Sequence, residues 1–399
     1  MSPVANYEWV NPETLAQTRR RLHLKPEDVA EQAAKLGSEY KKDITAKAIE
    51  SWEAGKQAPA LRHLEALSQI YVCPVGWFFL PDIPADSALL DFRGVAPGAR
   101  IGASGMQTLR RFQELADWAE DVAIQTGQFM KPNIGQASQR DEIEAVVQRE
   151  RGRVGFDARV RQQWQSNHQA FDWWRRRIEG LGVFCFVMRL PASEVRGASY
   201  FGVHGAAFIL VNSEDAESAT GRMFTLLHEY AHLVLRQSVV CDFRGSSDGK
   251  QVEHYANRFA AGMLLDHSEL EEHLYGLGMH RFREQWGDSM LDRIREPFFV
   301  SRDVISIYLE ELGLAPRGFY SSKRSAWASR SGFGRGGARP GRTQAVQRLG
   351  MVGNTLARVL SSSQAESAVS VLELAEVLDV KVEKIPAILE TFRSAGDDT

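Results

Sequence analysis

Apolar residues recur at helical spacing through the first part of the chain. The stripes lie at residues 15–24, 29–30, 44–52 and 61–70. This spacing gives each stretch one apolar face and predicts a set of short helices. Breaks separate these stretches at Gly37, Gly55 and Pro59, and Pro81 and Pro84 follow the last of them. We therefore expect an all-helical domain over residues 1–82, followed by a connection over residues 83–103.

The pattern changes from helical to extended once, in the middle of the chain. Helical spacing is found around residues 106–129, 141–151 and 162–178. Short runs of aromatic and β-branched residues follow at 183–190, 198–201 and 207–211, and helical spacing resumes near Ala219. Such runs predict a small antiparallel sheet of about three strands. The fold class is therefore mainly α with a small β-sheet (α+β), and we place this second domain at residues 104–315.

Residues 316–343 differ from both flanks. The stretch is rich in Gly, Ser and Arg, contains no acidic residue and shows no apolar period. It predicts a linker, after which helical spacing returns in a small C-terminal unit over residues 344–399. Seven basic residues from Arg317 to Arg342 alternate with Phe319, Tyr320, Trp327 and Phe333. A solvated tether or a single-stranded nucleic acid partner would fit this composition.

Composition narrows the class of protein. The chain has 399 residues, of which 44% are hydrophobic and 25% are charged, the balance of a globular protein with a large core. Its net charge of -3 means that any affinity for nucleic acid depends on a local basic patch. The three cysteines lie far apart, and no signal segment or long apolar run occurs. We expect a cytoplasmic protein without a disulfide framework.

The strongest chemical signal is His228-Glu229-Tyr230-Ala231-His232, an H-E-x-x-H on a predicted helix. The two histidines are one turn apart, so both imidazoles can reach one metal ion. A catalytic zinc needs a third protein ligand, and the next helix offers Glu253. Small side chains near the same face would let the two helices approach closely: Ala256, Ala260 and Ala261. His254 and His267 are weaker candidates.

Glu229 is the candidate general base. It lies beside the first ligand but is rotated about 100° around the helix axis, so it can face an attacking water without binding the metal. It would take the proton of that water and return it to the leaving amine. The alternative is that the motif arises by chance and both histidines are structural. Histidine and carboxylate ligands make Zn²⁺ the default ion, and Mn²⁺ also suits them.

Several strings around this motif resemble the ImmA/IrrE metallopeptidase family. They are ILVN at 209–212, Arg222, Phe224 and Thr225, ExxANxFAAxxLL at 253–265 and FFVSRDVISIYLEELGL at 298–314. The resemblance covers roughly residues 180–315. It implies a zincin-like, gluzincin-like endopeptidase with His228, His232 and Glu253 as metal ligands and Glu229 as catalyst. Tyr230-Ala231 replaces the usual Leu-Gly, and Asp266-His267 stands where a Met-Pro pair is common.

Residues 43–56 resemble the second half of an Xre/Cro-type helix-turn-helix. Thr45 would cap the recognition helix, Ile49 and Trp52 would face the core, and Gly55 would end the helix. The residues expected to contact DNA are Lys41, Lys42, Thr45, Lys47, Ser51 and Lys56, with Lys41, Lys42 and Lys56 at phosphates and Lys47 and Ser51 toward the major groove. Before them, AKLGSEYKKD is longer than the usual turn. A protein-binding module is the alternative, and a homodimer on palindromic DNA is expected if the domain reads DNA.

Together these patterns predict a DNA-binding regulatory metallopeptidase. The family resemblance implies that its substrate is a helix-turn-helix transcriptional repressor, whose cleavage would derepress stress-response or mobile-element genes. The alternative is a non-proteolytic transcriptional regulator, in which the His₂Glu set is structural or senses metal. A Glu229→Gln variant separates the two, because the metal ligands survive while the base is lost.

Overall fold

The computed structural model describes residues 9–21, 24–71, 73, 75–82, 103–190, 195–213, 219–237, 239–241, 250–330, 343–362 and 368–396. The chain divides into two compact units, one of residues 1–93 and 97–113 and the other of residues 94–96 and 114–399. We describe each unit by itself. None of the helices in the described ranges combines the length and the apolar character needed to cross a membrane.

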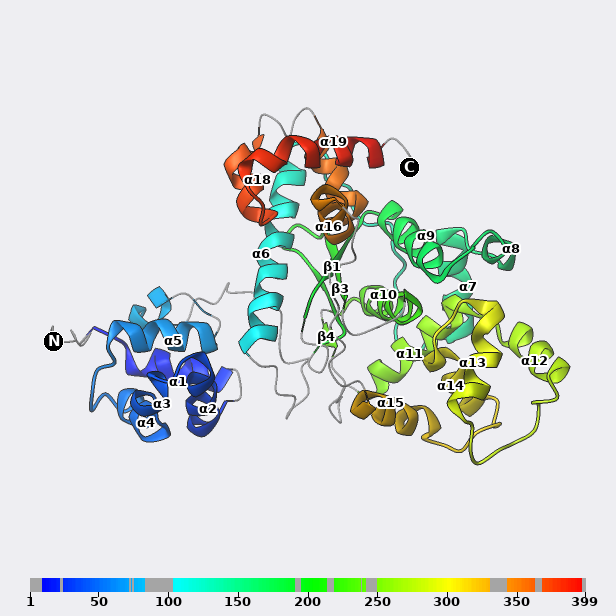
Figure 1. The fold of residues 1–399 in the computed structure, drawn as a ribbon, viewed down its shortest axis with the longest axis horizontal. Coiled ribbons are helices and arrows are strands. Elements are labelled where there is room, and N and C mark those ends of the chain that lie inside the picture. Colours follow the sequence, from blue (N-terminus) through cyan, green and yellow to red (C-terminus); the bar gives the residue numbers. More distant parts are fainter. Residues whose placement is uncertain are drawn as a thin grey trace. The chain divides into compact units, whose positions relative to one another are not determined.

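The N-terminal unit begins with six short helical elements (Figure 1). They are α1 (Pro12–Arg21), α2 (Pro26–Leu36), α3 (Tyr40–Asp43), α4 (Ala46–Glu53), α5 (Leu61–Tyr71) and the 3₁₀ turn η1 (Val75–Phe79). Leu15, Ile49, Leu67 and Phe78 are at most 1% exposed and belong to one apolar core. The predicted helical character of this region is therefore confirmed.

A paired charge joins the first and fourth helices of this unit. Arg19 Nε donates to Glu53 Oε1 at 2.6 Å, and Arg19 Nη2 donates to Glu53 Oε2 at 2.7 Å. Arg19 also donates to the Leu24 carbonyl at 2.6 Å. A bidentate guanidinium–carboxylate pair is geometrically specific, and both side chains are largely buried. The pair therefore fixes α4 against α1.

The larger unit contains a four-stranded mixed sheet. Its strands are β1 (Val183–Met188), β2 (Gly197–Phe201), β3 (Ala207–Asn212) and β4 (Val239–Cys241), in the order β1-β3-β2-β4. β1 runs parallel to β3, whereas β2 is antiparallel to both β3 and β4. The three expected strands, β1, β2 and β3, are all present and β4 is added to them, but the expectation of a purely antiparallel sheet was wrong because β1 runs parallel to β3. β3 lies between β1 and β2 in the sheet, so β1 and β2 are not neighbours although they follow one another in the chain. β4 has only three residues, which is too few to show a period in the sequence.

Helices surround this sheet and supply most of the core. Those up to the expected end of the second domain are α6 (Ala103–Gln125), which belongs to this unit only from Glu114 onward, α7 (Ile143–Val154), α8 (Ala158–Arg161), α9 (Asn167–Gly180), α10 (Ala219–Val234), α11 (Lys250–Leu264), α12 (His267–Gly276), α13 (Asp288–Arg295), η3 (Glu296–Phe298) and α14 (Arg302–Glu311). α10 contacts β2, β3, α9 and α11. It is thus the central helix of the unit, and the class of mainly α with a small sheet is confirmed (Figure 1).

The expected linker is helical in its first half. Residues Phe319–Arg330 form α15, and Phe319 is buried in the same core as α10. The Glu310 carboxylate accepts from the backbone N–H groups of Gly318, at 2.7 Å, and Tyr320, at 3.0 Å. Only three aromatic residues face the core, which is too few to give a helical period in the sequence. The remainder of the expected linker, residues 331–342, lies outside the described residues.

The C-terminal helices belong to the larger unit and are not a separate one. They are α16 (Gln344–Ser361), α18 (Val371–Val377), η4 (Val382–Lys384) and α19 (Ile385–Gly396). α16 packs on the edge strand β1 and on α9. The Thr355 hydroxyl donates to the Val183 carbonyl at 3.1 Å, and Arg175 donates to the Cys185 carbonyl. The outer edge of β1 is thereby covered (Figure 1).

A bend in α16 allows this close approach. Gly353 has a φ of +80°, a left-handed conformation inside the helix. A Cβ atom there would lie 2.1 Å from Glu179 Oε1 and 2.7 Å from the Cys185 carbonyl oxygen. Glycine is needed both for the dihedral angle and for the contact.

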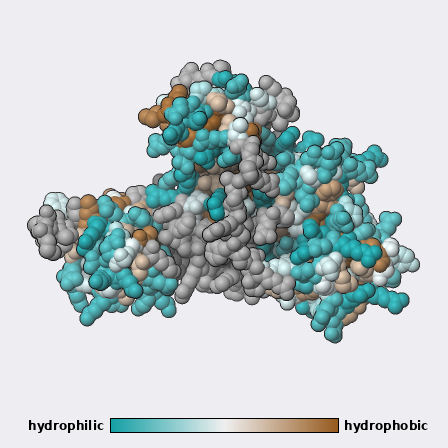
Figure 2. Space-filling model, viewed as in Figure 1, coloured by the Kyte–Doolittle hydropathy of each residue, from teal (hydrophilic) through white to brown (hydrophobic). Residues whose placement is uncertain are grey.

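The C-terminal helices expose apolar residues on α18, where Leu372 is 70% exposed and Val371 is 50% exposed (Figure 2).

Candidate metal centre

The helix α10 carries both motif histidines inside the core. All of its residues from Met223 to Val234 are buried. His232 is fully buried and His228 is 5% exposed. Apolar neighbours on every side hold the helix in place, and an imidazole in such surroundings must have a polar partner. The two histidines are therefore presented to each other and to the next helix.

Three candidate ligand atoms converge at this point. His228 Nε2 lies 3.2 Å from His232 Nε2 and 3.2 Å from Glu253 Oε2, and His232 Nε2 lies 3.4 Å from Glu253 Oε1. Tetrahedral zinc with bonds of about 2.0–2.1 Å places its ligand atoms about 3.3–3.4 Å apart. The three side chains thus have the spacing that one such ion requires. They form a potential metal site within the described residues.

Glu253 reaches the histidines because α11 packs closely on α10. The small residues that line this contact are completely buried: Ala256, Ala260 and Ala261. They leave no bulk between the helices, so a carboxylate from the first turn of α11 meets both imidazoles. The structure therefore brings together the three residues that the sequence predicts as ligands. His254, the weaker candidate, is exposed, and His267 pairs with Glu311.

Burial and mutual charge set the protonation of the three groups. Burial lowers the pKa of His228, against the raising effect of Glu253. Burial also acts to lower the pKa of His232, but hydrogen bonding to Glu253 and its charge outweigh burial and raise it. For Glu253, burial acts to raise the pKa, and the contacts with both histidines hold it well below its usual range. The carboxylate is therefore ionised, as a metal ligand must be.

Glu229 is completely buried and held from the sheet side. Its Oε2 accepts from the Ser199 hydroxyl on β2 at 2.9 Å. A Cβ atom at Gly197 would lie only 2.5 Å from Glu229 Oε1. Gly197 and Ser199 alternate along β2, so both side-chain positions lie on the sheet face that packs on α10. Strand β2 thus provides a space and a hydrogen bond for the candidate base.

Sequence reasoning did not assign either β2 residue to the site. Gly197 was visible only as a break between two extended runs. The available signal was the alternation of small residues, Gly197 and Ser199, in a strand just before the H-E-x-x-H helix. Small residues in a strand often mark a close approach of another element.

Tyr230, which departs from the family pattern, has a structural role. Its hydroxyl donates to Glu150 Oε2 on α7 at 2.7 Å, and its ring lies 6.1 Å from that of Phe259. Glu150 is fully buried and also meets Arg149 and Arg153. This network joins the metal-binding helix to α7.

The second departure, Asp266-His267, begins helix α12. The Asp266 carboxylate accepts from the Ser268 backbone N–H at 3.1 Å and lies 3.3 Å from Arg151 Nη1. His267 Nε2 lies 3.4 Å from Glu311 Oε2. The two residues therefore cap and position α12, and both point to contacts outside the group of three ligand atoms.

The residues expected to contact DNA lie at the surface of the N-terminal unit. Lys41 and Lys42 on α3, Lys47 on α4 and Lys56 beyond it are exposed, and Ser51 is half-buried. The Thr45 hydroxyl accepts from the Ala48 N–H at 3.2 Å and caps α4. Ile49 and Trp52 are buried. The long stretch before α4 is filled by the end of α2 and by α3, and binding to DNA stays a prediction.

The described aromatic residues of the expected nucleic-acid segment pack against the protein core. Phe319 is buried, and Tyr320 and Trp327 pack against the core of the larger unit. Trp327 Nε1 also donates to Asp288 at 3.3 Å. Phe333 and the last basic residues lie outside the described residues. The interpretation as a single-strand-binding segment stays a prediction that would depend on them.

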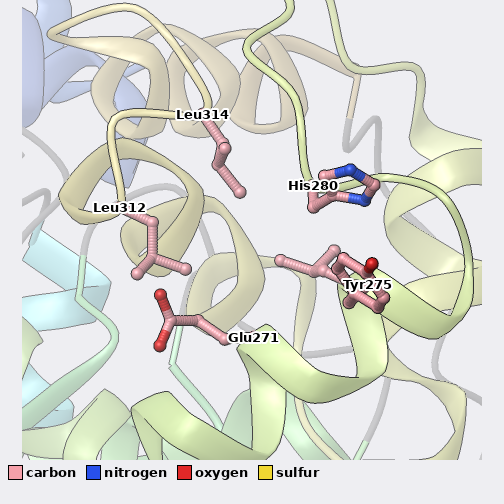
Figure 3. Close-up of a pocket in the computed structure, with 6 residues that line it drawn as sticks. Glu271, Tyr275, His280, Leu312 and Leu314 are labelled. Atoms are coloured by element: carbon pink, nitrogen blue, oxygen red, sulfur yellow. The ribbon is translucent and has the colours of Figure 1, made fainter.

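A small surface pocket lies away from the three ligand residues. It has a volume of about 190 Å³ and is lined by Glu271, Leu274, Tyr275, His280, Leu312 and Leu314 (Figure 3). Tyr275 and His280 lie side by side with ring centroids 4.8 Å apart. None of the three candidate metal ligands lines this pocket.

Comparison with known proteins relates part of the chain to a peptidase family. Residues 178–309 match the family model of Peptidase_M78, the IrrE N-terminal-like domain. This segment contains the whole sheet, the H-E-x-x-H helix, α11 and most of α14. No curated protein matches the chain, and no solved structure matches it.

Proposed function

We propose that the chain is a DNA-binding regulatory endopeptidase of the gluzincin-like type, because residues 178–309 match the IrrE N-terminal-like domain of Peptidase_M78. The observation that carries this proposal is the convergence of three side chains, in which each histidine Nε2 lies 3.2–3.4 Å from the other Nε2 and from one oxygen of Glu253, with the buried Glu229 on the helix that carries both histidines. Metal-dependent hydrolysis of a peptide bond requires a carboxylate that acts as base beside a coordination position that water can occupy.

In this proposal His228, His232 and Glu253 hold one divalent ion, with Zn²⁺ as the default and Mn²⁺ as the other candidate. Such an ion supplies Lewis acidity, which makes a water more acidic and a carbonyl more electrophilic. The fit depends on the spacing of the ligand atoms and on the ionised state of Glu253 described above. The two histidines are buried on α10, and Glu253, whose side chain is 25% exposed, lies on the adjacent α11, so packing between these helices would hold the ligands before metal binds.

Glu229 moves the proton. It takes one from the attacking water as the water oxygen bonds to the carbonyl carbon, and the π electron pair passes to the carbonyl oxygen. When the C=O double bond re-forms, the C–N bond breaks and Glu229 gives its proton to the leaving nitrogen. Ser199 donates to Oε2 at 2.9 Å and orients the carboxylate. Gly197 keeps the space around Oε1.

The proposed substrate is a helix-turn-helix repressor, and the proposed partner of residues 1–82 is double-stranded DNA. Lys41 and Lys42 on α3 and Lys56 beyond α4 would meet phosphates, and the side chains of Lys47 and Ser51 would face the groove. Joining a DNA reader to a peptidase raises the effective concentration of the active site near a repressor on the same operator. Tethering would then contribute to the choice of substrate, and cleavage would derepress the operator's stress-response or mobile-element genes.

The test is a comparison of cells that carry the wild-type protein with cells that carry Glu229→Gln. We expect one repressor fragment in the proteome with the wild type and none with the variant, while both proteins bind one metal per chain. Glu271→Gln, which removes an exposed carboxylate of the same domain, is the matched control and should keep the fragment. A Glu229→Gln variant with every wild-type effect in vivo would instead support a non-proteolytic regulator with a structural or metal-sensing His₂Glu site.

A further inference from the structure

Strand β2 is held on both faces of the sheet by two neighbouring residues. Successive side chains of a strand point to opposite faces. On one face, Ser199 Oγ donates to Glu229 Oε2 on α10 at 2.9 Å. On the other face, the Tyr200 hydroxyl donates to Asp117 Oδ1 on α6 at 3.0 Å. The part of α6 from Glu114 onward therefore lies across the sheet from α10 (Figure 1).

Tyr200 is a fixed donor in this arrangement. It is 6% exposed, and its ring stacks on that of Phe208 on β3 with centroids 5.1 Å apart. Burial raises the pKa of Tyr200, and the negative charge of Asp117 raises it further, so the hydroxyl keeps its proton and donates it. The side chain thus joins β2 to β3 and α6 at the residue next to Ser199.

A second carboxylate of α6 holds the turn that follows β2. Glu120 is 2% exposed and lies three residues after Asp117, on the same side of the helix. Its Oε1 accepts from the Ala206 N–H at 2.8 Å, and both its oxygens lie 3.2 Å from the His204 nitrogen. A Cβ atom at Gly202 would overlap this carboxylate. The turn between β2 and β3 is therefore folded around Glu120, which fixes the end of β2.

The helix α6 is itself anchored. Trp118 Nε1 donates to Glu373 Oε1 on α18 at 2.7 Å. Both α6 and α18 lie outside residues 178–309, the segment that matches the family model. The groups that fix β2 from the side opposite to α10 thus come from outside that segment.

We propose that Asp117 and Glu120 are positioning residues for the catalytic base, because they fix β2 at the place where Ser199 donates to Glu229. This inference rests on the peptidase function proposed above. It extends the machinery of the active site to a helix outside the matched segment.

The effect depends on the short reach of serine. A hydrogen bond between two oxygens requires a separation of roughly 2.5–3.0 Å, and the Ser199 hydroxyl cannot follow Glu229 if the strand moves away. A general base must in turn stay within hydrogen-bonding distance of the proton that it removes. A misplacement of about 1 Å can lower a rate about 100-fold. A movement of β2 would therefore impair proton transfer while the three metal ligands stay in place.

The experiment observes the Glu229 carboxylate directly in the zinc-free full chain. Glutamate is labelled with carbon-13 at its side-chain carboxyl carbon, and the Glu229 resonance is the one that disappears in Glu229→Gln. Tyr200→Phe removes the hydroxyl and keeps the packed ring, and Glu120→Met keeps the length of the side chain without its acceptors. Tyr308→Phe is the matched control, since Tyr308 is 3% exposed and donates to the Leu265 carbonyl at 2.7 Å.

We expect the Glu229 resonance to move in Tyr200→Phe and Glu120→Met in the direction in which Ser199→Ala moves it, and to stay in place in Tyr308→Phe. In cells, the repressor fragment should form up to about 100-fold more slowly with Glu120→Met, and less slowly with Tyr200→Phe. Zinc content should equal that of the wild type. Adding Tyr200→Phe to Ser199→Ala should cause no further loss, because both changes act through one hydrogen bond.

Three results would overturn the inference. They are an unmoved Glu229 resonance in Tyr200→Phe, an equal movement in Tyr308→Phe, which would mean a general loosening of the core, and losses that multiply when Tyr200→Phe is added to Ser199→Ala. If Glu120→Met does not fold, Tyr200→Phe decides alone.

The two proposals fail separately. If the resonance responds as expected but the wild type forms no repressor fragment, the peptidase function fails and the positioning of Glu229 by α6 stands. If the fragment forms but the resonance does not respond, the positioning role fails and the peptidase function stands.

Discussion

The N-terminal helices and the metal centre were both identified from short motifs, but the structure bears on them differently. At the candidate metal centre the histidines lie on the buried helix α10 and each comes within 3.2–3.4 Å of the other and of Glu253 on the adjacent α11. In the N-terminal unit the core residues meet each other, whereas the lysines expected to act on DNA face solvent. A buried site is assembled by the chain itself, and a surface site is completed only by its partner.

The difference teaches which observations can carry a functional conclusion. Removing a buried ligand changes a set of groups whose geometry is fixed. Removing an exposed lysine changes an interaction whose geometry depends on the partner and on salt. The following predictions use this contrast, beginning with the change of largest expected effect.

The sharpest test of the buried site is Glu253→Ala. A three-ligand site that loses one ligand should bind Zn²⁺ at least about 100-fold more weakly, since loss of a supporting residue alone can cost 10–100-fold. His254→Ala is the matched control, because this neighbour is exposed and should keep full metal affinity. Elemental analysis and competition with a chelator measure both. Full occupancy in Glu253→Ala would show that another residue is the third ligand.

The surface site is tested by the double change Lys41→Ala and Lys42→Ala in the full chain. If both lysines meet phosphates, the dependence of log K on log salt should become less steep by about 2, and affinity near physiological salt should fall roughly 30-fold. Titration of duplex DNA at several salt concentrations measures this. Lys384→Ala, an exposed lysine of the other unit, is the control. If the wild type does not bind DNA even at low salt, the domain recognises protein instead.

Gly197→Ala asks how tightly the buried site is packed. The new Cβ would lie 2.5 Å from Glu229 Oε1, and such overpacking destabilises a core by about 1–3 kcal/mol. We expect a lower denaturation midpoint and reduced hydrolysis, with zinc content preserved. Gly276→Ala should leave stability unchanged, because a Cβ there meets nothing within 4 Å. Equal stabilities of the two variants would refute the proposed contact between β2 and Glu229.

The smallest effect is expected at an exposed ion pair of the larger unit. Hydrogen bonding to Arg302 lowers the pKa of Asp292 to about 2, so its stabilisation is present above the unfolded pKa near 4 and is lost between about pH 4 and pH 2. The side chain is 37% exposed, so Asp292→Asn should cost less than about 1 kcal/mol. Urea unfolding at neutral and acid pH measures the difference, which should shrink as pH falls. A difference that grows would contradict this sign.

The sequence was sufficient for features that repeat or match a motif. Helical spacing predicted the helices, and the aromatic and β-branched runs predicted β1, β2 and β3. The alanines after Glu253 correctly indicated a close approach of α11 to α10. These are local patterns, and each depends on residues close together in the chain.

Features that depend on distant contacts could not be predicted. Whether β1 runs parallel or antiparallel to β3 depends on the path of the chain between them. The helix α15 lacks a period because its anchors are a carboxylate on α14 and another on α13. Ser199 and Gly197 belong to the site only through their contacts with Glu229, which follows Ser199 by thirty residues. Such pairs lie together in space but carry no joint signal in one sequence.

The covering of β1 by α16 has a consequence for the behaviour of shortened chains. The Val183 carbonyl oxygen accepts from Thr355 on α16, and the Cys185 carbonyl oxygen accepts from Arg175 on α9. These two acceptors at the outer edge of β1 are therefore hydrogen-bonded. A protein cut before α16 would keep the segment that matches the family model and the contact from Arg175 on α9, but it would lose the rest of the cover on the edge of the apolar strand β1. Such edges recruit strands from other molecules. The C-terminal helices therefore protect the catalytic sheet from self-association, and a minimal peptidase that ends at α15 would be expected to aggregate.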